Sequence, residues 1–248
     1  MEEGGRRTHG DLGLWCDDQV EPLARVARFI SQKGAVPGVQ LAHAGRKASE
    51  RRPWHGETPV DEEDIALRCE APWLALAPSA LPYGEPWPTP KAMSEEDIQS
   101  VLVAFRDAAE GALEAELQVI EVYAAHGFLA HQFYSPLSNH RADAYGGDFS
   151  GRVRFCLEVA DAIRSRWPER LPLCFRLSLT DWVVGGWILD ESIELARLLA
   201  LRGVDLIDCS SGGIGEHSNR QCPSARDSGC RPRLACGAKP GLRRWRWA

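Results

Sequence analysis

The stretch VIEVYAAHGFLAHQF, residues 119–133, places a tyrosine and a histidine three positions apart where a short apolar run ends. Tyr123 carries a phenol and His126 an imidazole, and both groups can donate hydrogen bonds and exchange protons. In α/β proteins, functional groups are usually placed where a buried strand ends. The pair is a catalytic candidate, although a single histidine here more often caps a turn or bonds a backbone carbonyl.

Polar residues also follow other apolar runs of the chain. They are Gln40 with His43, Arg176 with Ser178, and Ser210 with Ser211. Taken singly, Gln40 is expected to be a polar group at a strand end, and Arg176 a member of a structural ion pair. His43 and His131 are assigned structural roles.

The elements that must position these residues alternate along the chain. Helices are predicted at 17–33, 94–116, 150–167 and 190–201, and strands at 35–45, 118–122, 171–179 and 203–211. Asp17 or Asp18 is expected to cap the first helix, whose inward residues are Val20, Leu23, Val26, Ala27 and Ile30. Ser94 and Asp97 form a capping box before the second helix. Continuous apolar strands alternating with helices predict a parallel sheet covered by helices.

Two loops have distinctive compositions. Residues 45–93 are polar and Pro-rich, which predicts a long loop that is functional or ordered by packing. In the segment SNHRADAYGG, Arg141 and Asp143 are expected to brace a turn in which Gly146 and Gly147 adopt positive φ.

The composition excludes several classes of protein. The net charge of −6 gives the chain no overall positive field for nucleic acid, and no apolar run is long enough to span a membrane. The charged N-terminus lacks the apolar region of a secretory signal. Five cysteines scattered over helices, strands and loops are typical of buried thiols in a reducing compartment, so a cytoplasmic location is expected.

Several blocks together resemble the Old Yellow Enzyme family, the FMN-dependent NAD(P)H:flavin oxidoreductases, and within it the bacterial thermophilic-like ene-reductases. The blocks are THGDLGLWCDD, GVQLAHAGRKA, AAHGFLAHQFYSPLSNHRADAYGG, GRVRF and DLIDCSSGG. They occur in the family's order and cover roughly residues 4–213. The resemblance implies an α/β fold, a (β/α)8 TIM barrel of which this chain would hold roughly the third to sixth βα units.

The resemblance also implies a reaction and the residues that carry it. NAD(P)H would reduce FMN, which would then reduce an alkene activated by a carbonyl or nitro group. Gln40 matches the residue at the pyrimidine edge of the flavin, and Arg176 matches the arginine near that edge, which stabilises the reduced flavin. Tyr123, Ala124, Ala125 and His126 match the substrate-binding stretch, whose outer positions both carry histidine in this branch and polarise the substrate carbonyl.

The sequence departs from the family at chemically important positions. Tyr123 replaces the first histidine, and its phenol can still donate one hydrogen bond. Phe128 replaces a tyrosine that supplies the proton in many members, so solvent or Tyr123 itself would have to supply it. At residues 116–118, Glu-Leu-Gln replaces Gly-Phe-Asp, and losing the glycine is expected to strain the connection between helix and strand.

The ends of the chain lead to a second hypothesis. Residues 1–213 are interpreted as a partial FMN-oxidoreductase barrel, and 214–248 as a disordered or frameshifted tail outside the family pattern. Strands expected upstream and downstream are missing, so the open sheet edges are expected to favour self-association or a homo-oligomer. The usual phosphate site of such barrels would also be lost. The chain would then be an impaired enzyme or a non-catalytic fragment that binds no flavin.

A third hypothesis takes the tail as functional. His217, Cys222, Cys230 and Cys236 could form a zinc site, and the arginines could touch nucleic acid. The cysteine spacings are not the CxxC of structural zinc sites, and the rest of the chain is acidic. The preferred prediction therefore has a small-molecule substrate and neither a metal, nor nucleic acid, nor a membrane partner.

Overall fold

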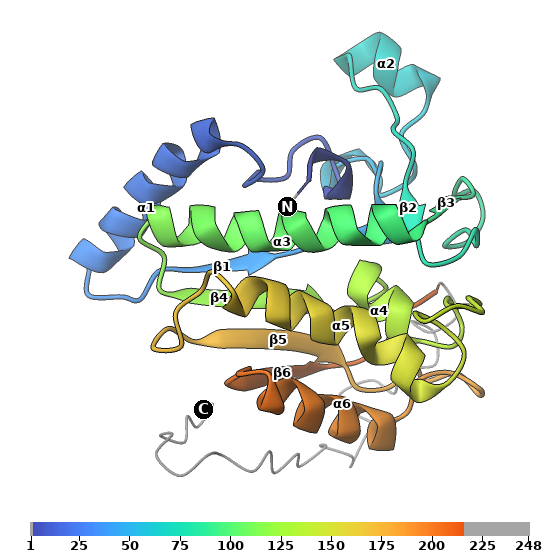
Figure 1. Cartoon of the computed structure of the whole chain (residues 1–248). Coiled ribbons are helices and arrows are strands. Elements are labelled where there is room, and N and C mark those ends of the chain that lie inside the picture. Colours follow the sequence, from blue (N-terminus) through green and yellow to red (C-terminus); the bar gives the residue numbers. More distant parts are fainter. Residues whose placement is uncertain (1, 216–248) are drawn as a thin grey trace, which may run out of the picture.

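The computed structural model describes residues 2–215. Its main sheet is parallel, with strand order β1-β4-β5-β6, where the strands are β1 Gly38–Leu41, β4 Val119–Ala124, β5 Leu173–Ser178 and β6 Leu206–Ser210. The long helices are α1 Val20–Gln32, α3 Glu95–Glu114, α5 Phe149–Arg164 and α6 Leu189–Leu201. In Figure 1, α3 and α5 lie in front of the sheet, between α1 and α6. This architecture confirms the predicted α/β class and the partial parallel barrel.

The helices form where apolar periodicity and capping agree. Ser94 accepts a hydrogen bond from Asp97 N at 3.1 Å and donates its own N–H to the Asp97 carboxylate at 2.8 Å, which confirms the capping box of α3. The apolar residues that recur at helical spacing along α5 are all buried: Val153, Leu157, Ala160 and Ile163. These faces pack on the sheet and form one hydrophobic core with it.

The expected details of α1 are partly wrong. The helix has no side-chain cap at its start, where Gln19 rather than Asp17 or Asp18 occupies the capping position. Ala24 and Ala27 are the buried residues, whereas Val26 is 54% exposed. Since α1 has a helix neighbour on one side only among the described elements, its apolar stripe is covered less completely than the spacing predicted.

The long loop of residues 45–93 contains structure that periodicity alone did not predict. It carries α2 Glu62–Arg68 and the two-stranded parallel sheet of β2 Leu76–Ala77 and β3 Lys91–Ala92. Short 3-10 helices lie at Glu3–Gly5, Asp17–Gln19, Gly45–Lys47 and Pro53–His55. Helix α2 begins with a capping box between Asp61 and Asp64, which is the sequence signal that could have revealed it. Figure 1 shows α2 standing away from the sheet.

Strand β4 extends further than predicted. It continues through Tyr123 to Ala124, and its burial alternates residue by residue. Ile120, Val122 and Ala124 face the core, so Glu121 and Tyr123 face the opposite side of the sheet. After His126 comes the short helix α4 Leu129–Tyr134, which the sequence prediction lacked.

Two predicted turns are confirmed in part. Glu116, at the position where the family has glycine, adopts φ of 60°, a left-handed conformation that costs a non-glycine residue energy. Arg141 donates to Asp143 at 3.0 Å as expected. Gly147 has φ of 73°, but Gly146 does not have positive φ; a Cβ there would lie 2.2 Å from the carbonyl oxygen of Arg141.

The cysteines are less uniformly buried than predicted. Cys156 and Cys174 are buried thiols, whereas Cys16, Cys69 and Cys209 are exposed. Within residues 2–215, no helix combines the length and apolar character needed to cross a membrane. The predicted tail of residues 214–248, with its candidate zinc ligands, falls almost entirely outside the described residues.

Candidate functional site

Three of the predicted site residues, Gln40, Tyr123 and Arg176, lie on the face of the sheet opposite the helices. Tyr123, Arg176 and Asp208 are direct neighbours across β4, β5 and β6. Gln40 of β1 is paired with Glu121, which precedes Tyr123 by two residues on the same face of β4. The Arg176 guanidinium lies 5.8 Å from the centre of the Tyr123 ring. Parallel pairing brings these residues together, although up to 168 positions separate them along the chain, from Gln40 to Asp208.

Gln40 and Arg176 each have an acidic neighbour. Gln40 Nε2 donates to Glu121 Oε1 at 2.5 Å. Arg176 Nε lies 3.4 Å from Asp208 Oδ2 as an ion pair, but Nε is buried and makes no hydrogen bond to the described residues. Arg176 Nε is therefore a buried donor that no described residue satisfies with a hydrogen bond.

His126 lies just beyond the end of β4 and contacts hydroxyl groups through both ring nitrogens. Its Nδ1 is hydrogen-bonded to the Tyr123 hydroxyl, and its Nε2 lies 2.5 Å from Ser210 Oγ. Burial, with a smaller contribution from the positive charge of Arg176, lowers the pKa of His126 to about 4. The imidazole is therefore neutral at pH 7 and can offer one N–H as a donor.

The backbone of His126 is held in an unusual conformation. Its φ is 52°, which is uncommon for a residue other than glycine. The His126 N–H donates to Ser178 Oγ at 2.9 Å, and Lys47 Nζ donates to the His126 carbonyl oxygen at 2.7 Å. Such strain persists only where the surroundings fix it, and it is frequent at functional sites.

Tyr123 lies between the guanidinium of Arg176 and the ring of Phe128. The Phe128 ring packs edge-on against Tyr123 with 4.5 Å between centres. Burial raises the pKa of the Tyr123 phenol, despite the opposing effect of Arg176, so the phenol stays protonated at neutral pH. Ala124 and Ala125 have fully buried side chains, so they lie in the predicted stretch without presenting side chains to the site.

Three of the residues around His126 were not assigned a role from the sequence. Ser178 and Ser210 were noted as polar groups at strand ends, and this position was the signal that could have identified them. Lys47 lies in the loop after β1, and burial lowers its pKa to about 7. Nothing in the local sequence around Lys47 indicates its contact with a carbonyl located 79 residues later.

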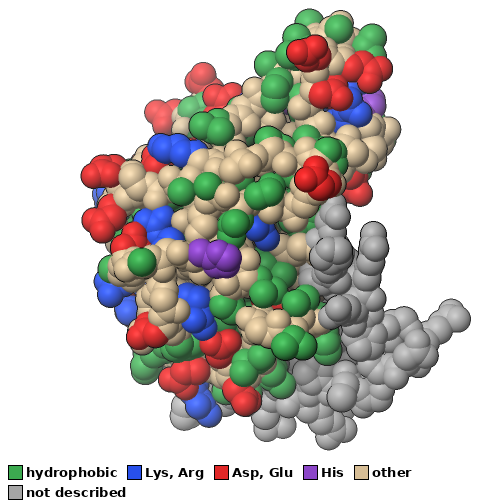
Figure 2. All heavy atoms as spheres, turned by 90° about the vertical axis from the view of Figure 1, so that its right-hand side faces the viewer, with side chains coloured by type: hydrophobic (Ala, Val, Ile, Leu, Met, Phe, Trp, Pro, Cys, Tyr) green, Lys and Arg blue, Asp and Glu red, His purple; other side chains and the backbone are tan. Residues whose placement is uncertain are grey.

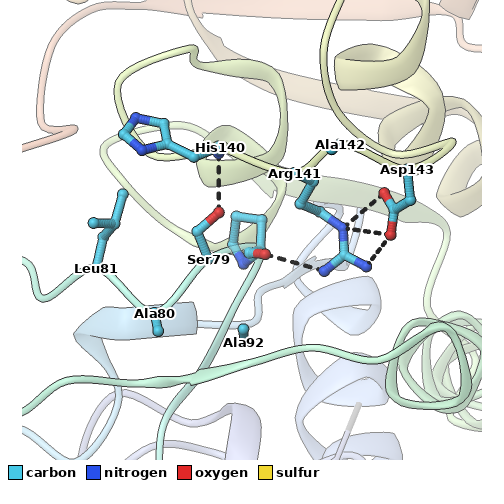
Figure 3. A pocket seen from close by; sticks show the side chains of 9 residues that line it. Ser79, Ala80, Leu81, Ala92, His140, Arg141, Ala142 and Asp143 are labelled. Carbon is cyan, nitrogen blue, oxygen red and sulfur yellow. Dashed lines mark hydrogen bonds and ion pairs between the residues drawn. The ribbon is translucent and has the colours of Figure 1, made fainter.

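The surface toward which the strands' carboxyl ends point is mixed in charge. Figure 2 shows acidic, basic and apolar side chains interspersed there, with undescribed residues covering part of the view. A separate hollow lies between residues 78–81 and 140–143 (Figure 3). In it, Arg141 bonds Asp143 and the backbone oxygens of Pro78 and Met93. Arg141 therefore ties loops together, as its predicted bracing role requires.

Known proteins are similar to this chain in sequence. Residues 1–229 match a family described as NADH:flavin oxidoreductase / NADH oxidase. A protein of Gibberella zeae named NADH:flavin oxidoreductase FG08077 is 42% identical over 225 residues, covering 86% of this chain and 54% of that protein. NADPH dehydrogenase of Bacillus subtilis is 40% identical over 210 residues, covering 85% of this chain and 55% of that protein.

Solved structures are also similar to this chain. Morphinone reductase superposes with a TM-score of 0.63 at 27% identity, covering 79% of this chain and 52% of that chain. The chain thus spans about half the length of the relatives that it matches.

Proposed function

Because the chain belongs to the NADH:flavin oxidoreductase / NADH oxidase family, we propose that it carries the ring-binding and carbonyl-binding residues of an FMN-dependent NAD(P)H oxidoreductase. The substrate class is alkenes activated by a carbonyl or nitro group. When bound, FMN carries hydride from the nicotinamide to the alkene. The observation that supports the proposal is that Gln40, Tyr123, Arg176 and His126 meet at one end of one sheet face.

The residues present fit the polar edge of a flavin ring. That edge offers carbonyl oxygens and an N–H group, which match an amide and a guanidinium. Arg176 Nε has no hydrogen bond to the described residues, and Gln40 keeps its amide oxygen and one N–H beyond its bond to Glu121. Arg176 also supplies the positive charge that stabilises an anionic reduced ring.

Tyr123 and His126 are suited to bind the carbonyl oxygen of a substrate. An oxygen placed between the Tyr123 hydroxyl and His126 Nδ1 would accept a hydrogen bond from each in place of their mutual bond. His126 Nε2 would then accept from the Ser210 hydroxyl, which fixes the proton on Nδ1. A neutral imidazole and a phenol together stabilise negative charge that grows on that oxygen.

Proton delivery differs from that implied for the family. Phe128 has no proton to give, and it packs against Tyr123. Where the Tyr123 hydroxyl donates to the substrate oxygen, we propose that solvent delivers the proton to the alkene carbon; where His126 alone binds that oxygen, Tyr123, whose phenol stays protonated, can deliver it. We also propose a cytoplasmic location and self-association through β1 and β6, the edge strands of the sheet in the part of the chain that the structure describes.

One observation favours the alternative, a chain that binds no flavin. Gln40 and Arg176 both have acidic neighbours, Glu121 at 2.5 Å and Asp208 at 3.4 Å. Such pairs reduce the cost of leaving the two residues without a ligand. Bound flavin distinguishes the two functions directly.

The test is FMN retention by the purified chain. After incubation with excess FMN and desalting, we expect a retained absorption band shifted from that of free FMN. Arg176→Met is expected to weaken retention by about tenfold or more, as expected for losing a charge-assisted hydrogen bond. Arg166→Met is the matched control, because Arg166 is 48% exposed and pairs with Glu110 on the helical side. A colourless chain would instead favour the non-catalytic alternative.

A further inference from the structure

The turn after β4 contains two consecutive residues in the left-handed conformation. His126 has φ of 52° and Gly127 has φ of 76°. Both backbone polar groups of Gly127 are bonded by side chains of α4: its N–H donates to His131 Nδ1 at 2.9 Å, and its carbonyl accepts from Gln132 Nε2 at 2.6 Å. A Cβ at Gly127 would lie 2.3 Å from the Gly213 carbonyl oxygen, so the turn is closed on its other side as well.

The hydrogen bonds of His131 determine which ring nitrogen carries its proton. A backbone N–H can only donate, so Nδ1 of His131 must accept and is unprotonated. Nε2 then carries the proton and donates to Asp181 Oδ1 at 2.8 Å. Both side chains are fully buried, so water cannot replace either bond.

Asp181 is itself fixed by further donors. Its Oδ2 accepts from Ser135 Oγ at 2.7 Å and from the Trp187 N–H at 2.8 Å. Burial alone would raise the pKa of Asp181, but the His131 ring and these hydrogen bonds hold it below its usual value. The carboxylate therefore stays ionised and keeps accepting from His131 Nε2.

We propose that His131 and Asp181 are positioning residues that aim the His126 imidazole into the site. The pair fixes the Gly127 N–H, and the peptide between His126 and Gly127 fixes the direction of the His126 side chain. An effect of this positioning on catalysis rests on the proposed function, in which His126 binds the substrate. The positioning itself can be measured in the chain without flavin.

Three substitutions separate the two ends of the His131 ring. In His131→Asn, the amide oxygen can take the place of Nδ1 and still accept from Gly127, although the contact with Asp181 is lost. His131→Leu removes both contacts. In Asp181→Asn, the amide N–H₂ can donate to His131 Nε2, which favours the tautomer with the proton on Nδ1. That N–H would then face the Gly127 N–H, so two donors would oppose each other.

The readout is the side-chain titration of His126 by NMR. The groups facing its imidazole are Tyr123, Arg176, Lys47 and His131. In the wild-type chain we expect a pKa near the value of about 4 set by burial. We expect His131→Leu and Asp181→Asn to raise it by about one unit or more toward the unperturbed value near 6.5, as the ring swings toward water. His131→Asn should keep it low.

Two further measurements keep the proposal testable. The ¹⁵N shifts of His131 in the wild-type chain must show a proton on Nε2 and none on Nδ1, and the opposite tautomer would overturn the proposal even if variants failed to fold. Folded variants with an unchanged His126 titration would overturn it too. In flavin-loaded enzyme, His131→Leu should lower kcat about tenfold with FMN retention unchanged. A chain that binds no FMN would end the proposed function but leave the NMR outcomes valid.

Discussion

The imidazole of His126 carries several constraints at once. Its ring contacts two hydroxyl groups, its backbone is left-handed, and burial lowers its pKa to about 4. A neutral ring that contacts a hydroxyl group at each nitrogen can donate from one nitrogen and accept at the other without carrying a charge. This property suits a group that must donate to a substrate oxygen without gaining a charge.

A first prediction concerns pH and stability. Unfolded His126 gains a proton near pH 6.5, whereas the folded protein gains it only near pH 4. The folded-state pKa is depressed, so the contribution of His126 to stability is present above about pH 6.5 and is lost as the pH falls toward 4. Urea unfolding between pH 7 and pH 5 should show this decline.

The matched variant for that experiment is His126→Asn. Asparagine tolerates the left-handed backbone at this position and does not titrate. The variant should lose less unfolding free energy than the wild type between pH 7 and pH 5. Equal losses in both proteins would contradict the depressed pKa of His126.

At the level of elements, the connection from α3 to β4 stores strain. Glu116 has φ of 60° and is exposed, and it makes one exposed ion pair with Arg28 at 3.3 Å. Glu116→Gly should therefore stabilise the chain by about 0.5–1 kcal/mol, since glycine adopts this conformation without a Cβ clash. Loss of the exposed ion pair subtracts little. Thermal or urea unfolding measures the effect.

The control for this change lies two residues earlier. Glu114 is the last residue of α3, where the backbone is right-handed, so Glu114→Gly should destabilise the chain by up to about 1 kcal/mol. Opposite signs for the two substitutions would locate the strain at Glu116. If Glu116→Gly and Glu114→Gly both destabilised the chain, the left-handed conformation of Glu116 would carry no energetic cost in the folded protein.

At the level of the whole molecule, the carboxyl ends and the amino ends of the strands have different roles. The carboxyl ends carry the candidate site, while Arg164 joins several segments at the amino ends of β5 and β6. Its guanidinium bonds the carbonyl oxygens of Gly203, at 2.7 Å, and Leu171, at 2.9 Å, and pairs with Asp205 at 2.6 Å. In barrels of this type, the amino end generally serves stability.

Arg164→Met is therefore expected to lower the free energy of unfolding by about 1–3 kcal/mol, because it leaves half-buried carbonyls and a half-buried carboxylate without their donor. Arg202→Met is the matched control: Arg202 is more exposed and forms an ion pair with Asp161 at 2.9 Å, so the substitution should cost less than about 1 kcal/mol. Urea unfolding compares the two. FMN retention at low denaturant should be equal for both, and its selective loss in Arg164→Met would contradict the separation of the two ends.

Local sequence determined much of this molecule. Apolar periodicity specified α1, α3, α5 and α6, and the Ser94–Asp97 box specified where α3 begins, because these signals act within one or two turns of chain. Five blocks, among them GVQLAHAGRKA with Gln40 and AAHGFLAHQFYSPLSNHRADAYGG with His126, indicated the family. Even the strain at Glu116 followed from the absence of one glycine.

Tertiary structure alone decided how those residues are used. Lys47 reaches the carbonyl of His126, and Asp181 sets the tautomer of a histidine located 50 positions earlier. The exposure of Val26 likewise depended on what packs nearby. A hydrogen bond between distant residues depends on which strands become neighbours, and no local pattern encodes that distance. The sequence thus supplied the chemical groups, and the parallel pairing of the strands decided which of them meet.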